Sequence, residues 1–156
     1  MPDEKKRSLV ELKVPCRPEF LRVVRLLVSG YATRWEMPFD EIEYLKVAVS
    51  EACNNAIQCA GEGKDEAVRI RCWREKGRLG FEVGYTGKSP ERPGGRTKKG
   101  APPEDETQLS LILIRMLMED VRISSTASKG TRIVMYKSLK AAGSARNVIE
   151  KKPGLN

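Results

Sequence analysis

The chain has 156 residues, a formal net charge of +8, four cysteines and no histidine. The length fits one domain with its own core, and neither a cleavable leader nor an apolar run of about 18 residues is visible, so we expect a cytoplasmic protein that enters no membrane. The absence of histidine disfavours a zinc site and the common histidine-based catalytic triads.

Basic residues outnumber acidic ones without forming a recognisable nucleic-acid motif. They are scattered along the chain and do not form a basic patch with interleaved aromatic residues. A basic surface can attract an acidic protein or a nucleic acid, but it can also be a solvated face. We rank the solvated surface first, a protein partner second and direct nucleic-acid binding last.

The order of the predicted elements indicates an α+β two-layer sandwich. In this order two helices follow the first strand, and a third helix lies between two hairpins. Three helices can then cover one face of a mostly antiparallel mixed sheet. In chain order, we expect a strand at 8–15, helices at 18–35 and 40–60, strands at 67–74 and 78–85, a helix at 109–121, and strands at 121–127 and 131–137.

The first two helices carry recognisable start and stop signals. Pro18 suits a first-turn position, and an apolar periodicity follows it. Asp40 with Glu43 resembles a capping box for the second helix. That helix is expected to stop at Gly61 or Gly63, because glycine is the usual exit residue.

Strict alternation of apolar and polar residues predicts two antiparallel hairpins. Residues 67–74 and 78–85 each place apolar side chains on one face, and the short turn 75–77 joins them. The second hairpin turns across 128–130. One face of each hairpin should therefore be covered.

The remaining segments set the domain boundaries. Residues 1–7 are polar and expected to be disordered, whereas 139–156 form a polar C-terminal tail. Between them, 8–138 form one domain. Its Gly- and Pro-rich loop 86–107 is either a functional lid or a disordered insert. Residues 109–121 are apolar nearly all round, and their length and Leu/Met content favour a buried helix over a strand.

Glu51 and Asn55 form the most informative pair in the chain. They are four residues apart in a predicted helix, so both side chains share one face. An amide oxygen can join a Mg²⁺ shell, and a carboxylate can take a proton from a hydroxyl. Taken alone the pair is weak, because most such pairs are the solvated face of an amphipathic helix.

The motifs around this pair are collinear with those of a known family. They are Val47–Ala52, Asn55-Ala56, Leu113–Val121 and Gly130–Arg132, in this order. Over roughly residues 8–137 the chain resembles the bacterial anti-sigma-factor serine/threonine kinases, which belong to the histidine-kinase-like ATPase (GHKL) superfamily. The resemblance implies that fold.

The resemblance also implies roles for particular residues. Glu51 corresponds to the catalytic base that readies a substrate serine. Asn55 corresponds to the residue that holds Mg²⁺ against the triphosphate of ATP. Thr131 corresponds to the threonine at the adenine end. ATP and Mg²⁺ are thus the cofactors that the family implies.

The chain departs from the family pattern at both ends of the nucleotide site. In the run Val83–Gly87, Tyr85 stands where the family has the aspartate that accepts a hydrogen bond from adenine, while Gly87 is kept. Tyr85 is either a core aromatic that fills an unused pocket or a stacking platform for a different ligand. Before the third helix, Gln108 and Ser110 replace two glycines that let backbone N–H groups approach phosphate.

These departures favour a non-catalytic or weakly catalytic regulator over an active enzyme. The first hypothesis is a partner-switching protein that binds a sigma factor, an anti-sigma antagonist or another signalling protein, with ATP binding weak or lost. The alternative is an active ATP- and Mg²⁺-dependent serine kinase of an anti-sigma factor antagonist. A third is a basic nucleic-acid-associated protein. Whether the chain forms a homodimer stays open.

Overall fold

The computed structural model describes residues 3–60, 67–86, 104–126 and 130–139. The elements are α1 (Glu4–Ser8), β1 (Val10–Pro15), a 3₁₀ turn (Pro18–Phe20), α2 (Leu21–Arg34), α3 (Phe39–Ala60), β2 (Ala67–Glu75), β3 (Arg78–Thr86), α4 (Glu104–Leu117), β4 (Asp120–Thr126) and β5 (Gly130–Ser138). Most of the lid loop and of the C-terminal tail, at 87–103 and 140–156, lies outside the described residues. Among the described helices, none is both long and apolar enough to cross a membrane.

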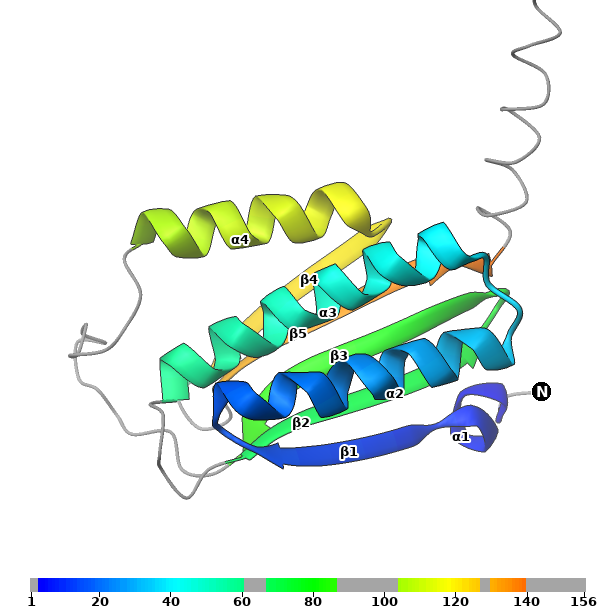
Figure 1. The fold of residues 1–156 in the computed structure, drawn as a ribbon, viewed down its shortest axis with the longest axis horizontal. Coiled ribbons are helices and arrows are strands. Elements are labelled where there is room, and N and C mark those ends of the chain that lie inside the picture. Colours follow the sequence, from blue (N-terminus) through cyan, green and yellow to red (C-terminus); the bar gives the residue numbers. More distant parts are fainter. Residues whose placement is uncertain (1–2, 61–66, 87–103, 127–129, 140–156) are drawn as a thin grey trace, which may run out of the picture.

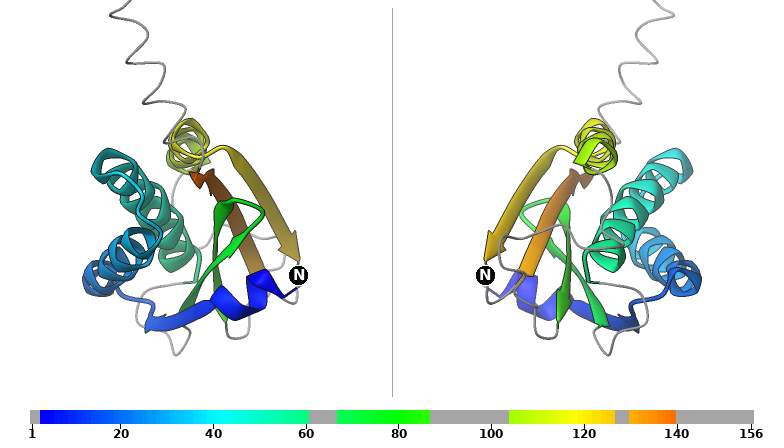
Figure 2. Two further views of the ribbon diagram at one scale, coloured as in Figure 1. Left: turned by 90° about the vertical axis from the view of Figure 1, so that its right-hand side faces the viewer. Right: turned by 90° about the vertical axis from the view of Figure 1, so that its left-hand side faces the viewer.

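The described strands form one sheet in the order β1-β2-β3-β5-β4, and every neighbouring pair is antiparallel. Helices α2, α3 and α4 lie on the same face of the sheet, with α3 between the other two (Figures 1 and 2). The prediction of an α+β two-layer sandwich covered by three helices is confirmed. The sheet is antiparallel throughout its described strands.

The core lies between the helices and the inner face of the sheet. Alternation along β2 turns Val68, Ile70 and Cys72 inward, and all three are fully buried. On α3, Leu45 and Val49 pack from the other side because they recur on one helical face. This packing fixes α3 on the sheet. It therefore also fixes the position of the polar side chains on the opposite side of α3.

The β2–β3 hairpin closes with a two-residue turn. Glu75 pairs with Arg78, and the two residues between them, Lys76 and Gly77, have φ values of 52° and 74°. Two successive left-handed residues are typical of a type I′ turn, whose twist matches that of the strands. Gly77 adopts this conformation without a Cβ penalty.

The outer face of the sheet carries an aromatic pair. Trp73 and Tyr136 meet edge to face, with ring centroids 5.9 Å apart. Gly80 lies directly beneath the indole ring, where a side chain would overlap it. Lys5 covers the ring from α1, with its Nζ 4.2 Å from the centroid. Trp73 is consequently buried although it faces away from the helices.

The expected disorder of residues 1–7 was wrong for Glu4–Arg7, which belong to α1. Glu4 forms an ion pair with Arg74 at 2.7 Å. Ser8 Oγ accepts a hydrogen bond from the backbone N–H of Arg74 at 2.8 Å. These partners lie about 70 residues further along the chain, so the polar composition of the segment gave no sign of them.

Two helix starts also differ from the prediction. The α4 helix begins at Glu104, inside the expected loop 86–107, and ends at Leu117 rather than at residue 121. It ends there because the N–H of Glu119 bonds the carbonyl of Tyr136 and the chain enters the sheet. The predicted capping box was wrong because α3 begins at Phe39, which places Asp40 within its first turn.

Candidate functional site

Glu51 and Asn55 lie on one half-buried face of α3, as their spacing predicts. The residues between them on the helix, Ala52 and Cys53, point into the core. The two polar side chains are therefore held at a fixed place on α3, within hydrogen-bonding reach of α4.

Ser110 of α4 joins these two residues. Its hydroxyl donates a hydrogen bond to Oε1 of Glu51 at 2.9 Å. Oγ of Ser110 also accepts a hydrogen bond from Nδ2 of Asn55 at 3.2 Å. Ser110 is only 9% exposed, so this arrangement lies at the contact between the two helices. A hydroxyl has one donor and two acceptor positions, and here it uses both functions.

The carboxylate of Glu51 thus already accepts a hydrogen bond from a serine hydroxyl. Hydrogen bonds to an ionised group are stronger than those between neutral groups. An incoming hydroxyl would have to displace Ser110 or share the carboxylate with it. Sequence reasoning placed Ser110 at the phosphate end of the site and missed this bond, because the partners are 59 residues apart.

Asn55 is the residue of this arrangement for which the family resemblance predicts a role as a metal ligand. Its Nδ2 is used by Ser110, and no hydrogen bond reaches its Oδ1 from the residues that the structure describes. Carbonyl-type oxygens suit Mg²⁺. The described residues contain no cluster of three acidic or cysteine side chains that could hold a metal ion. A Mg²⁺ ion here would need most of its ligands from water or from a bound phosphate.

Tyr85 lies near the C-terminal end of β3. It is partly buried and packs against the hydrophobic core. Gly84 pairs with Arg132, which places Tyr85 and Thr131 at the same end of the sheet. A Cβ on Gly84 would lie 3.3 Å from the carbonyl oxygen of Thr131, so the strands are closely apposed there.

Two other site residues were predicted, and the structure describes one of them. Gly87 lies outside the described residues. Gln108 is exposed on α4, two residues before Ser110. Cys59 is exposed one helical turn after Asn55.

The two core thiols, Cys53 and Cys72, supply no thiolate near neutral pH. Burial raises the pKa of Cys72 to about 12. Burial, together with the nearby Cys72, also raises the pKa of Cys53 well above its ordinary value. Both thiols therefore stay protonated, and a protonated thiol is a poor nucleophile.

Residues 14–137 match the histidine kinase-like ATPase domain, and the chain belongs to this family. Its relatives include serine-protein kinase RsbW of Bacillus subtilis (strain 168), which is 38% identical over 138 residues, or 83% of this chain and 85% of that protein. RsbW of Bacillus pumilus (strain SAFR-032) is 34% identical over 142 residues, or 85% of this chain and 86% of that protein. RsbW of Bacillus velezensis is 37% identical over 139 residues, or 83% and 85% of the two chains. The resemblance found in the sequence motifs is thereby confirmed.

Proposed function

We propose that this chain is a cytoplasmic regulator that acts by binding a protein partner in a partner-switching pathway, with ATP binding weak or lost. The partner is a sigma factor, an anti-sigma antagonist or another signalling protein. The observation that carries the proposal is the Ser110 hydroxyl, which bonds both Glu51 and Asn55. The two residues that would serve ATP chemistry are both hydrogen-bonded to another residue of the chain.

The residues present fit only the metal end of a nucleotide site. Asn55 offers an amide oxygen to Mg²⁺, but Tyr85 packs against the core where the family has a carboxylate for adenine. Ser110 stands where the family has a phosphate-binding glycine. A buried polar group left unpaired costs about 1–3 kcal/mol. Two such losses would turn micromolar binding into millimolar binding, since about 1.4 kcal/mol is tenfold.

An exposed apolar stripe on α4 supports a protein partner. Leu109, Ile112 and Met116 are exposed, and their spacing places them on the side opposite the buried Ser110 and Ile114. Contiguous exposed apolar residues with polar surroundings are typical of protein-binding surfaces. We infer that this stripe contributes to partner binding.

Two measurements test the proposal together. Calorimetric titration of Mg-ATP into the pure protein should give no binding in the low micromolar range, and binding in that range would contradict the loss of the site. Capture from the native cell should identify the partner, whose affinity is then measured with purified proteins. Met116→Ser should weaken that affinity, whereas Leu26→Ser on α2 is the matched control, because the two side chains are 75% and 72% exposed. Equal affinities in both variants would remove α4 from the binding surface.

The second candidate function is an active serine kinase of an anti-sigma factor antagonist, using ATP and Mg²⁺. It is favoured by one contact: Glu51 already accepts a hydrogen bond from a serine hydroxyl, which is the geometry that a general base requires. Transfer of phosphate from ATP to the captured partner would support this function. It would also show that Tyr85 does not prevent nucleotide binding.

A further inference from the structure

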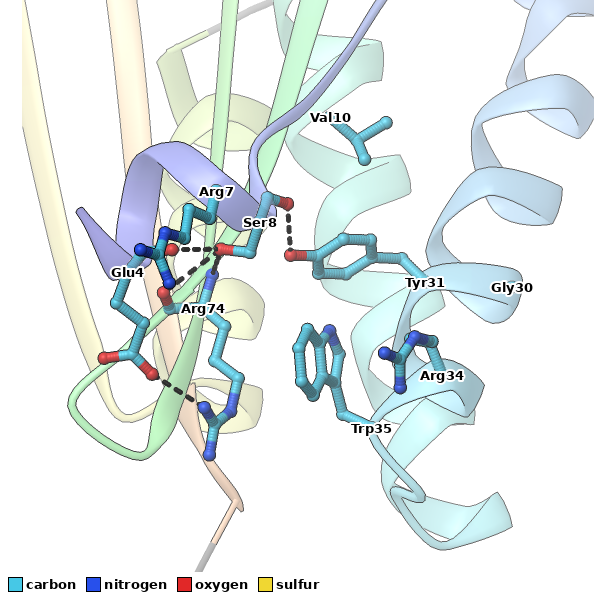
Figure 3. Close-up of a pocket in the computed structure, with 9 residues that line it drawn as sticks. All are labelled: Glu4, Arg7, Ser8, Val10, Gly30, Tyr31, Arg34, Trp35 and Arg74. Atoms are coloured by element: carbon cyan, nitrogen blue, oxygen red, sulfur yellow. Dashed lines mark hydrogen bonds and ion pairs between the residues drawn. The ribbon is translucent and has the colours of Figure 1, made fainter. Parts of the chain in front are cut away.

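A cavity of about 660 Å³ lies between the N-terminal segment and the end of α2. Its wall comes from α1, the start of β1, the last turns of α2 and the end of β2 (Figure 3). In Figure 1, α1 and the end of α2 lie at one end of the sheet, whereas the C-terminal half of α3 and the start of α4 lie at the other. The cavity is therefore separate from Glu51 and Asn55.

The charged groups of the wall leave an excess of positive charge. Glu4 is already engaged, since its Oε2 accepts a bond from Nη1 of Arg74 at 2.7 Å. Its Oε1 accepts a bond from the backbone N–H of Lys76 at 3.1 Å. Among the described residues, no carboxylate forms an ion pair with the two other arginines of the wall, Arg7 and Arg34.

Trp35 lies between two guanidinium groups in this wall. The Cζ atoms of Arg34 and Arg74 are 4.8 and 4.9 Å from the centroid of its ring. Its Nε1–H and the Nε–H of Arg74 are buried, and neither has a hydrogen-bond partner within the described part of the chain. Leaving such a group unpaired is costly, so these donors add to the positive character of this part of the wall.

Tyr31 does not supply an acceptor for the indole N–H of Trp35. Its hydroxyl donates to the carbonyl oxygen of Ser8 at 2.8 Å (Figure 3). Burial raises the pKa of Tyr31, and the neighbouring Ser8 and Trp35 oppose this rise. The indole N–H thus lies near the Tyr31 oxygen without completing a hydrogen bond to it.

We propose that this cavity binds a small organic anion, with a carboxylate or phosphate group on an apolar or aromatic body. The anionic group would accept hydrogen bonds from Arg7 and Arg34, which both line the cavity and are donors. The apolar body would lie against Val10 and Tyr31. The volume is within the range of small-molecule sites, which combine apolar walls with a few polar groups.

The test follows the indole N–H signal of Trp35 by NMR in the full-length chain. The chain has two tryptophans, and Trp73→Phe identifies the signals. The probes are phenyl phosphate and benzoate, with neutral benzamide as their control. We expect a saturable shift of the Trp35 signal with both anions. The Trp73 signal should stay in place, because its indole N–H already bonds Glu75 at 3.0 Å.

A pair of charge variants separates a specific site from general attraction. Arg34→Gln should weaken phenyl phosphate binding about tenfold, because a charge-assisted hydrogen bond is lost. Arg25→Gln removes the same charge from an exposed position of α2 outside the cavity wall, and should change the affinity by less than about twofold. Equal losses in the two variants would overturn the proposal.

Three further results would also overturn it. One is an unshifted Trp35 signal with both anions at about 10 mM, which would exclude even weak binding. Another is benzamide binding as tightly as benzoate, since the cavity would then select for apolar surface and not for charge. The last is a shift with an acidic peptide but with neither small probe.

Discussion

Replacing Ser110 by alanine and, separately, by glycine distinguishes two reasons why the site should bind Mg-ATP weakly. Alanine removes the hydroxyl that bonds Glu51 and Asn55 but keeps Cβ. Glycine removes both the hydroxyl and Cβ. If the occupied side chains weaken binding, both variants should improve it. If Cβ keeps phosphate away from the backbone N–H groups, only glycine should do so.

The size of the effect follows from the two hydrogen bonds. A hydrogen bond to a charged group contributes about 1.5–3 kcal/mol, and partial exposure of Glu51 reduces this to about 1 kcal/mol. Alanine should therefore tighten Mg-ATP binding about fivefold, since about 1.4 kcal/mol is tenfold. Glycine should add roughly another fivefold through the closer backbone approach. Because glycine is unfavourable within a helix, its variant should also lose about 1 kcal/mol of stability relative to alanine.

Calorimetry with Mg-ATP and urea unfolding of the same samples measure both quantities. A fall in the free energy of unfolding in Ser110→Ala would verify that the hydrogen bonds were lost. If nucleotide affinity nevertheless stayed unchanged in both variants, the hydroxyl would not limit binding and the reasoning would be refuted. Tyr85→Asp alone should not restore tight binding, because the phosphate end would still lack its glycine. Its combination with Ser110→Gly should bind more tightly than either single variant.

Three other predictions concern different parts of the molecule. Any phosphate transfer should be lost in Glu51→Ala and in Asn55→Ala, whereas partner affinity should persist. A general base typically raises the rate about 10²–10⁴-fold, so transfer that survives in Glu51→Ala would rule out Glu51 as the base. Burial raises the pKa of the Cys72 thiol from 9.0 to about 12, so the folded state holds this proton more tightly than the unfolded state. The stability that Cys72 contributes in this way should be full below pH 9.0 and be lost as the pH rises towards about 12. A Cys72→Ala variant whose alkaline unfolding has the same pH dependence would contradict this. Gly80→Ala should lower the free energy of unfolding by about 2–3 kcal/mol, because the new Cβ overlaps the buried ring of Trp73; an unchanged urea midpoint would disprove the clash.

Those parts of the fold that depend on local periodicity could be predicted from the sequence. The alternation in β2 and β3 predicts their hairpin and its buried face because successive side chains point to opposite sides of a strand. The spacing of Glu51 and Asn55 predicts their shared helical face for a similar reason. In both cases the pattern that predicts the structure lies within a few residues along the chain.

The parts that could not be predicted depend on contacts between distant residues. Glu4 is ordered by Arg74, which belongs to the far end of β2. The bond between Ser110 and Glu51 requires α4 to be placed against α3. Neither contact leaves a local pattern. The presence of a serine where the family has glycine was the one available signal, and it was interpreted as a steric change only.

The Ser110 contact gives Glu51 and Asn55 a structural role that does not require catalysis. One buried hydroxyl satisfies a carboxylate and an amide across the contact between two helices. Removing Ser110 takes this hydrogen bond from both partners, whereas removing Glu51 or Asn55 leaves one function of the hydroxyl unpaired, at a cost of about 1–3 kcal/mol for a buried group. The pair would therefore be kept in a protein that binds its partner without phosphorylating it. Its presence is compatible with both functions, and the two departures at Tyr85 and Ser110 are what favour the regulator.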